Sequence, residues 1–363
     1  MIKGPRVLAL TGEEDGCTLW RVWQPYAELA RQGYAAWWRD KDDPQLATAE
    51  WAYLAATRLE AIVLPRLSWA DHQAARTFVR TMHQSGLAVI YDVDDDLLSP
   101  QIEARLHATT QRTKSFEQLE QDRRDRLVAI RLCDGVTTSS EYLAEVIRHY
   151  VEVPVIVVPN AIDVRWFRRV LRSAPRAVPP LSIGWAGGSR FVADLEPIAE
   201  AWQHVARQRP DINFVVQGFL TPELTQAVPA DRLYVLPWMR AADYPLGLQN
   251  VDIACCTVAA THFNRCKTPI KLWEFTLAGA VSVVSPTLYG PVASSGTDAL
   301  VAETAADWEA ALLRLIDDAA LRRRLWRAQR WRVVCEHALA HHAHEWPRAW
   351  STILEAFRLQ QAA

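Results

Sequence analysis

The sequence has no long apolar run and almost no net charge: its 363 residues sum to −2. No stretch approaches the ~18 apolar residues that a membrane span needs, and the apolar run at residues 6–10 is too short for a signal peptide. The small net charge argues against binding polyanions over the whole surface, although a local basic face stays open. We expect a cytoplasmic protein without a transmembrane segment, and peripheral membrane contact stays open.

Paired metal-binding motifs are also missing. The six cysteines are scattered, with no Cys-x-x-Cys pair, which is typical of a reduced chain without a zinc knuckle. His337 and His341 stand four residues apart, but the His-Glu-x-x-His pattern of a zinc-binding helix is absent. We predict no bound metal and no cofactor.

Lysine is scarce, with five among 40 basic residues, so the other 35 are arginines. Two of the five, Lys267 and Lys271, stand four residues apart, and Glu274 follows three residues later. Lysine is a compact point charge suited to phosphate, whereas arginine is a planar fork. The pair predicts a phosphate-bearing ligand. The alternative is a surface ion pair between Lys271 and Glu274, which are spaced i,i+3 on a helix.

Short, nearly all-apolar segments alternate with helical stretches along the chain. This pattern is typical of βαβ units and of parallel sheets buried on both faces. A proline-rich connector at residues 173–180 interrupts the alternation, which restarts at Leu181. The length also favours two domains. Predicted strands cover 6–11, 35–38, 61–65, 87–92, 135–138, 155–159, 181–187, 212–216, 233–236, 252–256 and 281–285; predicted helices cover 44–58, 69–84, 101–132, 140–149, 192–208, 268–279 and 337–359.

Polar groups follow several predicted strands, at the edge where parallel sheets bind ligands. In the first half this edge holds the Asp15-Gly16 loop, with Arg21 in the helix that follows, and the acidic run 92–96. Carboxylates at a strand end can bind a divalent metal, act as a general base or hold sugar hydroxyls. The alternative is a helix cap with solvated charges.

In the second half, the strand 181–187 runs into Gly187-Gly188-Ser189-Arg190. Adjacent glycines let backbone N–H groups approach an anion, and the next helix offers its positive end. Arg190 adds a charge. The pattern is neither the dinucleotide fingerprint nor a P-loop, and glycine pairs also form plain tight turns.

Three segments carry a resemblance to a known family. They are residues 183–189 (IGWAGGS), residues 157–163 (VVPNAID) and the motif Phe263-Asn264-x-x-Lys267-x-x-x-Lys271-x-x-Glu274-Phe275-x-x-x-Gly279. The chain resembles retaining glycosyltransferases of the GT-B fold, family 4-type (glycosyl transferases group 1), in the branch of O-antigen, capsule and phage gene clusters. The resemblance covers most of residues 130–330.

The resemblance implies an α/β GT-B fold of two Rossmann-like parallel-sheet domains facing a cleft. Residues 1–172 would bind the acceptor, 173–180 would be a linker, 181–335 would bind the nucleotide-sugar, and 336–363 would return to the first domain as a helix. The donor would be a UDP- or GDP-sugar. The acceptor hydroxyl would belong to a saccharide, a lipid-linked glycan, a protein or a modified base of phage-type DNA. A DNA acceptor would need a basic groove, for which the arginine-rich stretches 122–131 and 165–176 are candidates.

The resemblance also implies residue roles. Glu274 would hydrogen-bond the ribose, while Lys267 and Arg190 would stabilise the diphosphate. Cys266 stands eight residues before Glu274, where many members carry a glutamate that contacts the sugar, so the sugar contact is unassigned. We predict Lys267, Arg190 and Asp95 as catalytic; Gly187, Gly188, Ser189, Asn264, Lys271 and Glu274 as donor-binding; and Asp15, Gly16, Arg21, Asp94 and Asp96 on the acceptor side. Two alternatives remain: a non-catalytic nucleotide-sugar-binding protein, suggested by Cys266, and a GT-B sugar-nucleotide epimerase.

Overall fold

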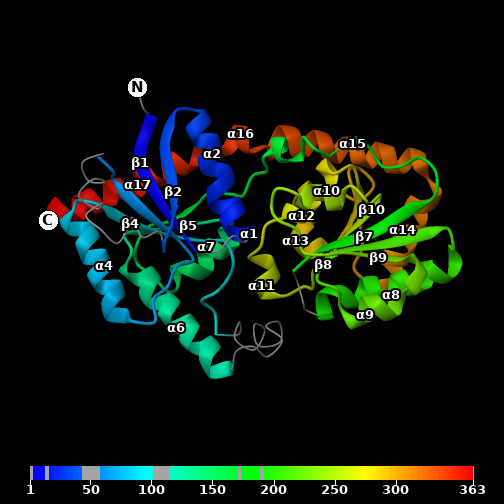
Figure 1. Ribbon diagram of the computed structural model, residues 1–363, viewed down its shortest axis with the longest axis horizontal. Coiled ribbons are helices and arrows are strands. Elements are labelled where there is room, and N and C mark those ends of the chain that lie inside the picture. The colour runs from blue at the N-terminus through cyan, green and yellow to red at the C-terminus, as the bar shows by residue number, and fades with distance from the viewer. Residues whose placement is uncertain are drawn as a thin grey trace. The chain divides into compact units, whose positions relative to one another are not determined.

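The computed structural model describes residues 3–12, 16–42, 58–100, 115–170, 173–188 and 192–362. The chain divides into two compact units, each built on one six-stranded parallel sheet (Figure 1). Unit 1 comprises Met1–Ala161, Cys266–Thr268 and Leu339–Ala363, and unit 2 comprises Ile162–Arg265 and Pro269–Ala338. The predicted pair of parallel-sheet Rossmann-like units is confirmed.

The sheet of unit 1 has the strand order β2-β1-β3-β4-β5-β6. All six predicted strands of the first half form, with ends shifted by a few residues. Their bounds are β1 Lys3–Thr11, β2 Tyr34–Asp40, β3 Ala61–Pro65, β4 Ala88–Val93, β5 Gly135–Thr138 and β6 Val155–Val157.

Alternate side chains of these strands enter two separate cores, because successive residues of a strand point to opposite faces. On β1, Leu8 and Leu10 pack into one core, while Val7 and Ala9 pack into the other. The strands are apolar at nearly every position because both faces are covered. This is the physical basis of the apolar runs in the sequence.

The helices of unit 1 lie on both faces of the sheet (Figure 1). One core joins the sheet to α4, α6 and α7, and the other joins it to α2, α16 and α17. The predicted helix 44–58 and the first part of 101–132 fall outside the described residues. The helix bounds are α1 Gly16–Thr18, η1 Leu19–Trp23, α2 Gln24–Arg31, α4 His72–Gln84, α6 Phe116–Leu132, α7 Glu141–Arg148, α16 Leu339–His342 and α17 Glu345–Ala362.

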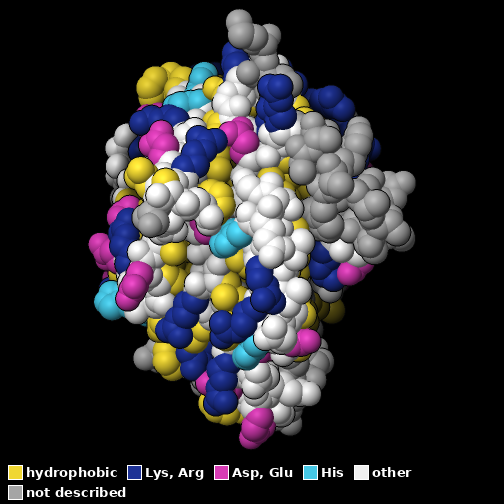
Figure 2. Space-filling model, turned by 90° about the vertical axis from the view of Figure 1, so that its left-hand side faces the viewer, with side chains coloured by type: hydrophobic (Ala, Val, Ile, Leu, Met, Phe, Trp, Pro, Cys, Tyr) yellow, Lys and Arg dark blue, Asp and Glu magenta, His cyan; other side chains and the backbone are white. Residues whose placement is uncertain are grey.

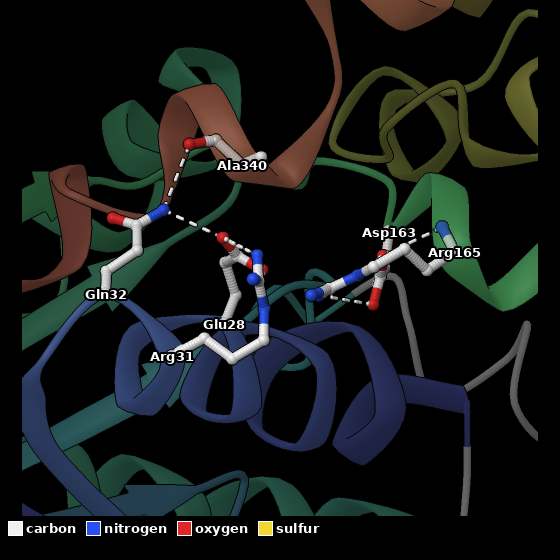
Figure 3. Close-up of polar contacts among 6 residues, drawn as sticks. All are labelled: Glu28, Arg31, Gln32, Asp163, Arg165 and Ala340. Carbon is white, nitrogen blue, oxygen red and sulfur yellow. Dashed lines mark hydrogen bonds and ion pairs between the residues drawn. The ribbon is translucent and has the colours of Figure 1, made fainter.

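The C-terminal segment forms two helices, α16 and α17, where the sequence predicts one over 337–359. Trp346 and Trp350 of α17 are buried against Tyr26 of α2. The end of α2 also holds α16 by polar contacts (Figure 3): Gln32 Nε2 donates to the carbonyl of Ala340 at 3.0 Å and to the buried Glu28 at 2.8 Å. The C-terminal residues therefore complete the core of unit 1.

The sheet of unit 2 has the order β12-β11-β10-β7-β8-β9. Its main core packs the sheet against α8, α14 and α15, with Trp202 and Trp308 fully buried at its centre. The five predicted strands form, and β12 is an addition. The bounds are β7 Leu181–Gly187, β8 Ile212–Gly218, β9 Leu233–Leu236, β10 Ile253–Cys256, β11 Val281–Val284 and β12 Leu300–Val301.

The helices of unit 2 include one long helix, α15, that the sequence does not predict, and α12 is shorter than the predicted 268–279. Their bounds are η3 Val164–Phe167, α8 Val192–Gln208, α9 Pro222–Ala227, η4 Ala230–Arg232, α10 Tyr244–Leu248, α11 His262–Arg265, α12 Ile270–Leu277, α13 Pro286–Tyr289, α14 Ala305–Asp317 and α15 Ala319–Glu336.

The chain passes from unit 1 to unit 2 at Ala161, upstream of the proline-rich segment 173–180. Asp163 then caps η3, since its carboxylate accepts from the backbone N–H of Arg165 at 2.9 Å (Figure 3). The proline-rich segment is itself part of unit 2. The buried Arg322 donates to the carbonyls of Arg176 and Ala177 at 3.0 and 2.9 Å and so fixes the segment in place.

Candidate active site

The order of the strands in unit 2 gives its sheet a topological switch point. β7 lies between β8 and β10, so the chain leaves β7 on one side and returns on the other. Ligands of open parallel sheets bind outside the carboxyl ends of the strands at such a switch point. Gly187 and Gly188 end β7 and begin its loop, and the segment 257–269 leads from the end of β10 into α12.

Glycines allow close packing along β7 and beside its carboxyl end. A Cβ on Gly184 would lie 2.3 Å from a methyl carbon of Val251, and one on Gly218 would lie 2.6 Å from the carbonyl oxygen of Gly187. A Cβ on Gly188 would instead meet only the ring of Trp238, at 3.5 Å. Gly184 and Gly218 are therefore needed for packing, while Gly188 is the exposed residue at the end of β7.

Trp238 is a site residue that the sequence analysis misses. It follows β9 at the same carboxyl edge, and 73% of its surface is exposed. An indole ring in water beside the backbone of Gly188 forms a flat apolar platform. The available signal was a tryptophan two residues after a predicted strand, although the sequence alone does not place that residue beside the glycine loop.

Tyr244, Lys271 and Glu274 form a polar cluster at this edge. Lys271 Nζ donates to Glu274 Oε2 at 2.7 Å and to the hydroxyl of Tyr244 at 2.6 Å, and that hydroxyl donates to the same Oε2 at 3.3 Å. The predicted alternative, an ion pair between Lys271 and Glu274, therefore exists. It is buried on the glutamate side only, since the side chain of Glu274 is 2% exposed and that of Lys271 is 33% exposed. Trp166 stacks on Tyr244, with ring centroids 6.0 Å apart.

The electrostatics of the cluster keep Lys271 charged. Burial lowers the pKa of Lys271, but the Glu274 carboxylate and Tyr244 outweigh it, so this pKa lies above its ordinary value. Burial and the charge of Glu274 raise the pKa of Tyr244, so the phenol stays protonated. Glu274 Oε1 accepts no hydrogen bond from any residue in the described ranges. One carboxylate oxygen thus holds the cluster together, and the other is available to a ligand.

The other predicted donor residues are placed differently. Asn264 is fully buried, and its Nδ2 donates to Asp194 Oδ1 at 2.7 Å and to the carbonyl of Ala259 at 3.0 Å. We therefore assign Asn264 to holding the loop after β10, in place of the predicted donor contact. Lys267 is half-buried and belongs to unit 1 with its two neighbours. Ser189 and Arg190 lie outside the described residues.

Unit 1 has a corresponding switch point, at β1 between β2 and β3. A pocket of about 360 Å³ opens there, between the segment that follows β1 and the end of β3. Its charged lining consists of four cations and one carboxylate: Arg21, Lys41, Arg66, Arg126 and Asp92.

The carboxylate of this pocket is neutralised by Arg21. Arg21 and Asp92 form two hydrogen bonds, at 3.0 and 2.9 Å, and both side chains are 1% exposed. Arg21 Nη1 also donates to Val158 and Asn160. Proline at position 25 cannot donate to the carbonyl of Arg21, and the preceding turn widens to a π-helix, η1, from which Arg21 reaches inward. Arg21, predicted on the acceptor side, thus fixes the floor of the pocket.

The acidic run after β4 is divided between two roles. Asp96 is buried and accepts from the backbone N–H groups of Leu98 and Ser99 at 3.1 and 3.0 Å, as a turn cap does. Asp94 and Asp95 lie beside Arg66, with N–O distances of 3.8 and 3.7 Å. Burial, with the charge of Asp95 second, raises the pKa of Asp94 to about 6.

Arg66 occupies the centre of this acidic cluster. It has a left-handed backbone, with φ +55°, and its guanidinium contacts the thiol of Cys17 as well as the two carboxylates. Cys17, Asp94 and Asp95 present ligand atoms within 4.8 Å of one another, close enough to share a metal ion. Gly16 begins α1 and is exposed, and Asp15 lies outside the described residues.

Comparisons with known proteins agree with this architecture. The family model described as glycosyl transferase-like matches residues 197–347. The Bacillus subtilis (strain 168) protein TuaH, assigned as a glycosyltransferase of teichuronic acid biosynthesis, is 28% identical over 206 residues, which cover 53% of this chain and 48% of TuaH. The match thus spans about half of that relative's length.

Solved structures extend the likeness to nearly the whole chain. Sucrose-phosphate synthase from Thermosynechococcus elongatus is similar with a TM-score of 0.65 at 15% identity, over 98% of this chain and 100% of that one. Anabaena HepE in complex with UDP has a TM-score of 0.63 at 13% identity, over 96% and 100%. These likenesses show that the chain has the GT-B fold. The predicted GT-B fold is confirmed.

Cys266 is the residue for which the resemblance implies a glutamate in many members of the family. The residue is 0% exposed and packs within the apolar core of unit 1. Burial raises the pKa of its thiol to about 12, so it stays protonated and unreactive. Cys266 is therefore a packing residue. Of the helices that the structure describes, none is long and apolar enough to cross a membrane.

Proposed function

We propose that this GT-B protein is a glycosyltransferase that moves a sugar from a nucleotide-diphosphate sugar to an acceptor hydroxyl, with retention and without a metal ion. One observation carries the donor half of the proposal. The buried Glu274 has one oxygen bonded to Lys271 and Tyr244 and the other unbonded within the described ranges. A fixed carboxylate oxygen at the ligand edge of a parallel sheet suits the paired hydroxyls of a ribose.

Other residues at the carboxyl edge of the unit 2 sheet suit the diphosphate and the base of a nucleotide-sugar. The backbone of Gly187 and Gly188 can approach a diphosphate without a side chain in the way, and we propose that Arg190 supplies charge to it. Lys267 remains a predicted catalytic residue. The exposed ring of Trp238 would stack on the nucleobase. HepE, which is similar in fold, was solved with UDP and with UDP-glucose, and this supports a UDP-sugar as the first donor to test.

The pocket of about 360 Å³ in unit 1 is our candidate for acceptor binding. It lies at the switch point of its own sheet and offers cations and hydrogen-bond donors, which suit the oxygens of a saccharide or of a lipid-linked glycan. A modified DNA base is less well supported, since the backbone of a duplex needs an extended basic groove.

In the proposed reaction, the bond between the sugar C1 and the diphosphate oxygen breaks, and a bond from C1 to the acceptor oxygen forms on the same face. The acceptor proton goes to Asp94 or to the departing diphosphate. Asp94 replaces Asp95 as the preferred base, because a pKa of about 6 suits proton transfer near neutral pH. Developing charge on the diphosphate is stabilised by fixed donors, and each such donor typically contributes about 3–4 kcal/mol to lowering the barrier.

The proposed independence from metal rests on Arg66. Its guanidinium contacts the side chains of Cys17, Asp94 and Asp95, the set that offers metal-ligand atoms. A resident cation already offsets part of the negative charge of those carboxylates. Turnover that persists in EDTA is the expected result, and loss of turnover that Mg²⁺ or Mn²⁺ restores would contradict it.

The test begins with binding. UDP, GDP and their sugars are screened for a rise in melting temperature, and the best ligand is titrated by calorimetry into the wild type and into Glu274→Gln. A lost charge-assisted hydrogen bond corresponds to about 10–100-fold weaker binding. Glu336→Gln is the matched control, since Glu336 also pairs with a basic residue in unit 2 but lies on α15. Equal affinity of wild type and Glu274→Gln would refute the assigned site.

Catalysis is tested separately with the donor that binds. Release of nucleotide and a glycosylated acceptor are expected, and proton NMR of the product gives the anomeric configuration that decides retention. Binding without any release would instead indicate a non-catalytic nucleotide-sugar-binding protein. A donor recovered with an inverted sugar carbon would indicate an epimerase.

A further inference from the structure

A second concave surface of unit 1 lies away from the ligand edge of its sheet. It is a groove of about 750 Å³ between α4, the end of α6 and the end of α17, lined by Gln73, Arg76, Val79, Arg80, His83, Gln84, Arg131, Leu132 and Gln361. His83 and Gln84 precede β4, and Arg131 and Leu132 precede β5. The groove therefore lies toward the amino ends of the strands, opposite the candidate acceptor pocket.

The described lining of the groove carries positive charge and no carboxylate. Arg76, Arg80 and Arg131 line it, and its described lining includes no carboxylate. Figure 2 shows this side of the molecule, where Lys and Arg side chains gather in the lower half. The chain as a whole carries −2, so the charge of the groove is a local property.

The arginines keep most of their hydrogen-bond donors unused. Arg76 and Arg80 are exposed, and neither forms a hydrogen bond or an ion pair with a residue in the described ranges. Arg131 donates from Nε to the carbonyl of Tyr150 at 2.9 Å, which leaves both Nη groups for a ligand. The ring of His83 is fixed by Asp134 at 3.0 Å.

Other arginines on the helices of unit 1 form ion pairs with glutamates of their own helix. On α6, Arg123 and Arg124 both bond to Glu120, and on α7 Arg148 bonds to Glu141. On α4, by contrast, Arg76 and Arg80 stand at i and i+4 on one face, a spacing at which like charges repel. A bound anion would relieve this repulsion.

We propose that this groove binds a phosphate-bearing anion, either a soluble phosphate compound or the phosphate headgroup of a lipid. The planar forks of three arginines match phosphate oxygens by paired hydrogen bonds. A volume of about 750 Å³ is within the range of small-molecule sites. The site is distinct from the proposed donor and acceptor sites and does not depend on the proposed transferase activity.

The test compares two double variants of the full chain. Arg76→Glu/Arg80→Glu alters the groove. Arg323→Glu/Arg327→Glu is the matched control, because these two arginines are also exposed at i,i+4, on α15 of unit 2. The probes are inorganic diphosphate, titrated by calorimetry, and vesicles of phosphatidylcholine with or without phosphatidylglycerol, measured by co-sedimentation.

We expect the groove variant to bind at least one probe more than ~10-fold more weakly than wild type, and the control variant to bind like wild type. Loss confined to diphosphate identifies a soluble ligand, and loss confined to phosphatidylglycerol vesicles identifies a lipid headgroup. Equal binding by the two variants, or no binding of either probe by the wild type, overturns the proposal. Donor binding and sugar transfer to a soluble acceptor should be unchanged in the groove variant, which separates this result from any failure of the proposed function.

Discussion

Replacing Asp94 by asparagine tests both the electrostatics of unit 1 and the proposed base. The side chain of Asp94 is 9% exposed, and its Oδ1 is buried without a hydrogen bond. Burial, with Asp95 second, raises the pKa of Asp94 from 3.8 to about 6 in the folded protein. Asparagine has a similar shape but never carries the charge.

The expected effect on stability follows from this pKa. The folded state holds the proton more tightly than the unfolded chain, so stability is lost as pH rises from about 4 through about 6. A shift of about 2 units corresponds to ~3 kcal/mol above pH 7, as an upper value. Asp94→Asn does not carry this cost. Its free energy of unfolding should exceed that of wild type at pH 7.5, and the difference should shrink toward zero near pH 4.

Urea unfolding followed by tryptophan fluorescence at several pH values measures this difference. Transfer activity should fall by about 10²–10⁴-fold in the same variant, and the wild-type rate should rise with pH through about 6. Asp95→Asn removes the charge that helps to raise the pKa of Asp94, so this rise should move to lower pH. A stability difference that is independent of pH would refute the electrostatic reasoning, and an unchanged rate would refute the role as base.

Two further predictions concern unit 2. Trp238→Ala should weaken nucleotide binding in calorimetry by about 5–100-fold, as expected when stacking on a base is lost. Trp331→Ala is the control, because Trp331 is also exposed (63%) but lies on α15, and it should leave nucleotide binding unchanged. Equal effects of the two substitutions would show that Trp238 does not stack on the base. Gly184→Ala should lower the free energy of unfolding by about 1–3 kcal/mol in urea, because its Cβ would lie 2.3 Å from Val251. If Gly184→Ala were as stable as wild type, the expected steric clash between a Cβ at position 184 and Val251 would be refuted.

The strands and the fold class were predictable because they rest on a strong local signal. A strand buried on both faces must be apolar at nearly every position, and the runs at β3, β4, β8 and β11 have that composition. Helix α15 escaped prediction because its sequence carries arginines around most of its circumference. The side of the helix that faces the core carries the buried Arg322 as well as Leu321, Leu325 and Trp326. The sequence therefore shows no continuous apolar stripe at helical spacing.

The sequence predicted which residue types form the candidate site, but it did not predict which side chains contact one another. The two lysines and the glutamate pointed to α12, but Tyr244 lies 27 residues before Lys271 and could not be assigned to the cluster from spacing. The pairing of Arg21 with Asp92, 71 residues apart, depends on the folded sheet in the same way. Asn264 looked like a ligand contact because a motif gives the residue type and not the direction in which the side chain points.

The assignment of the last 25 residues to unit 1 affects how the protein is made. Residues 162–338, which include all of unit 2, leave the ribosome before Leu339–Ala363 can cover the face of the first sheet with Trp346 and Trp350. At typical rates of synthesis this interval lasts on the order of 10–30 s. During that time the apolar face around Tyr26 lacks its native cover, while unit 2, apart from the short insertion 266–268, is already complete in sequence. The first half to be synthesised is thus the last to finish folding, and truncation near the C-terminus would damage the N-terminal unit.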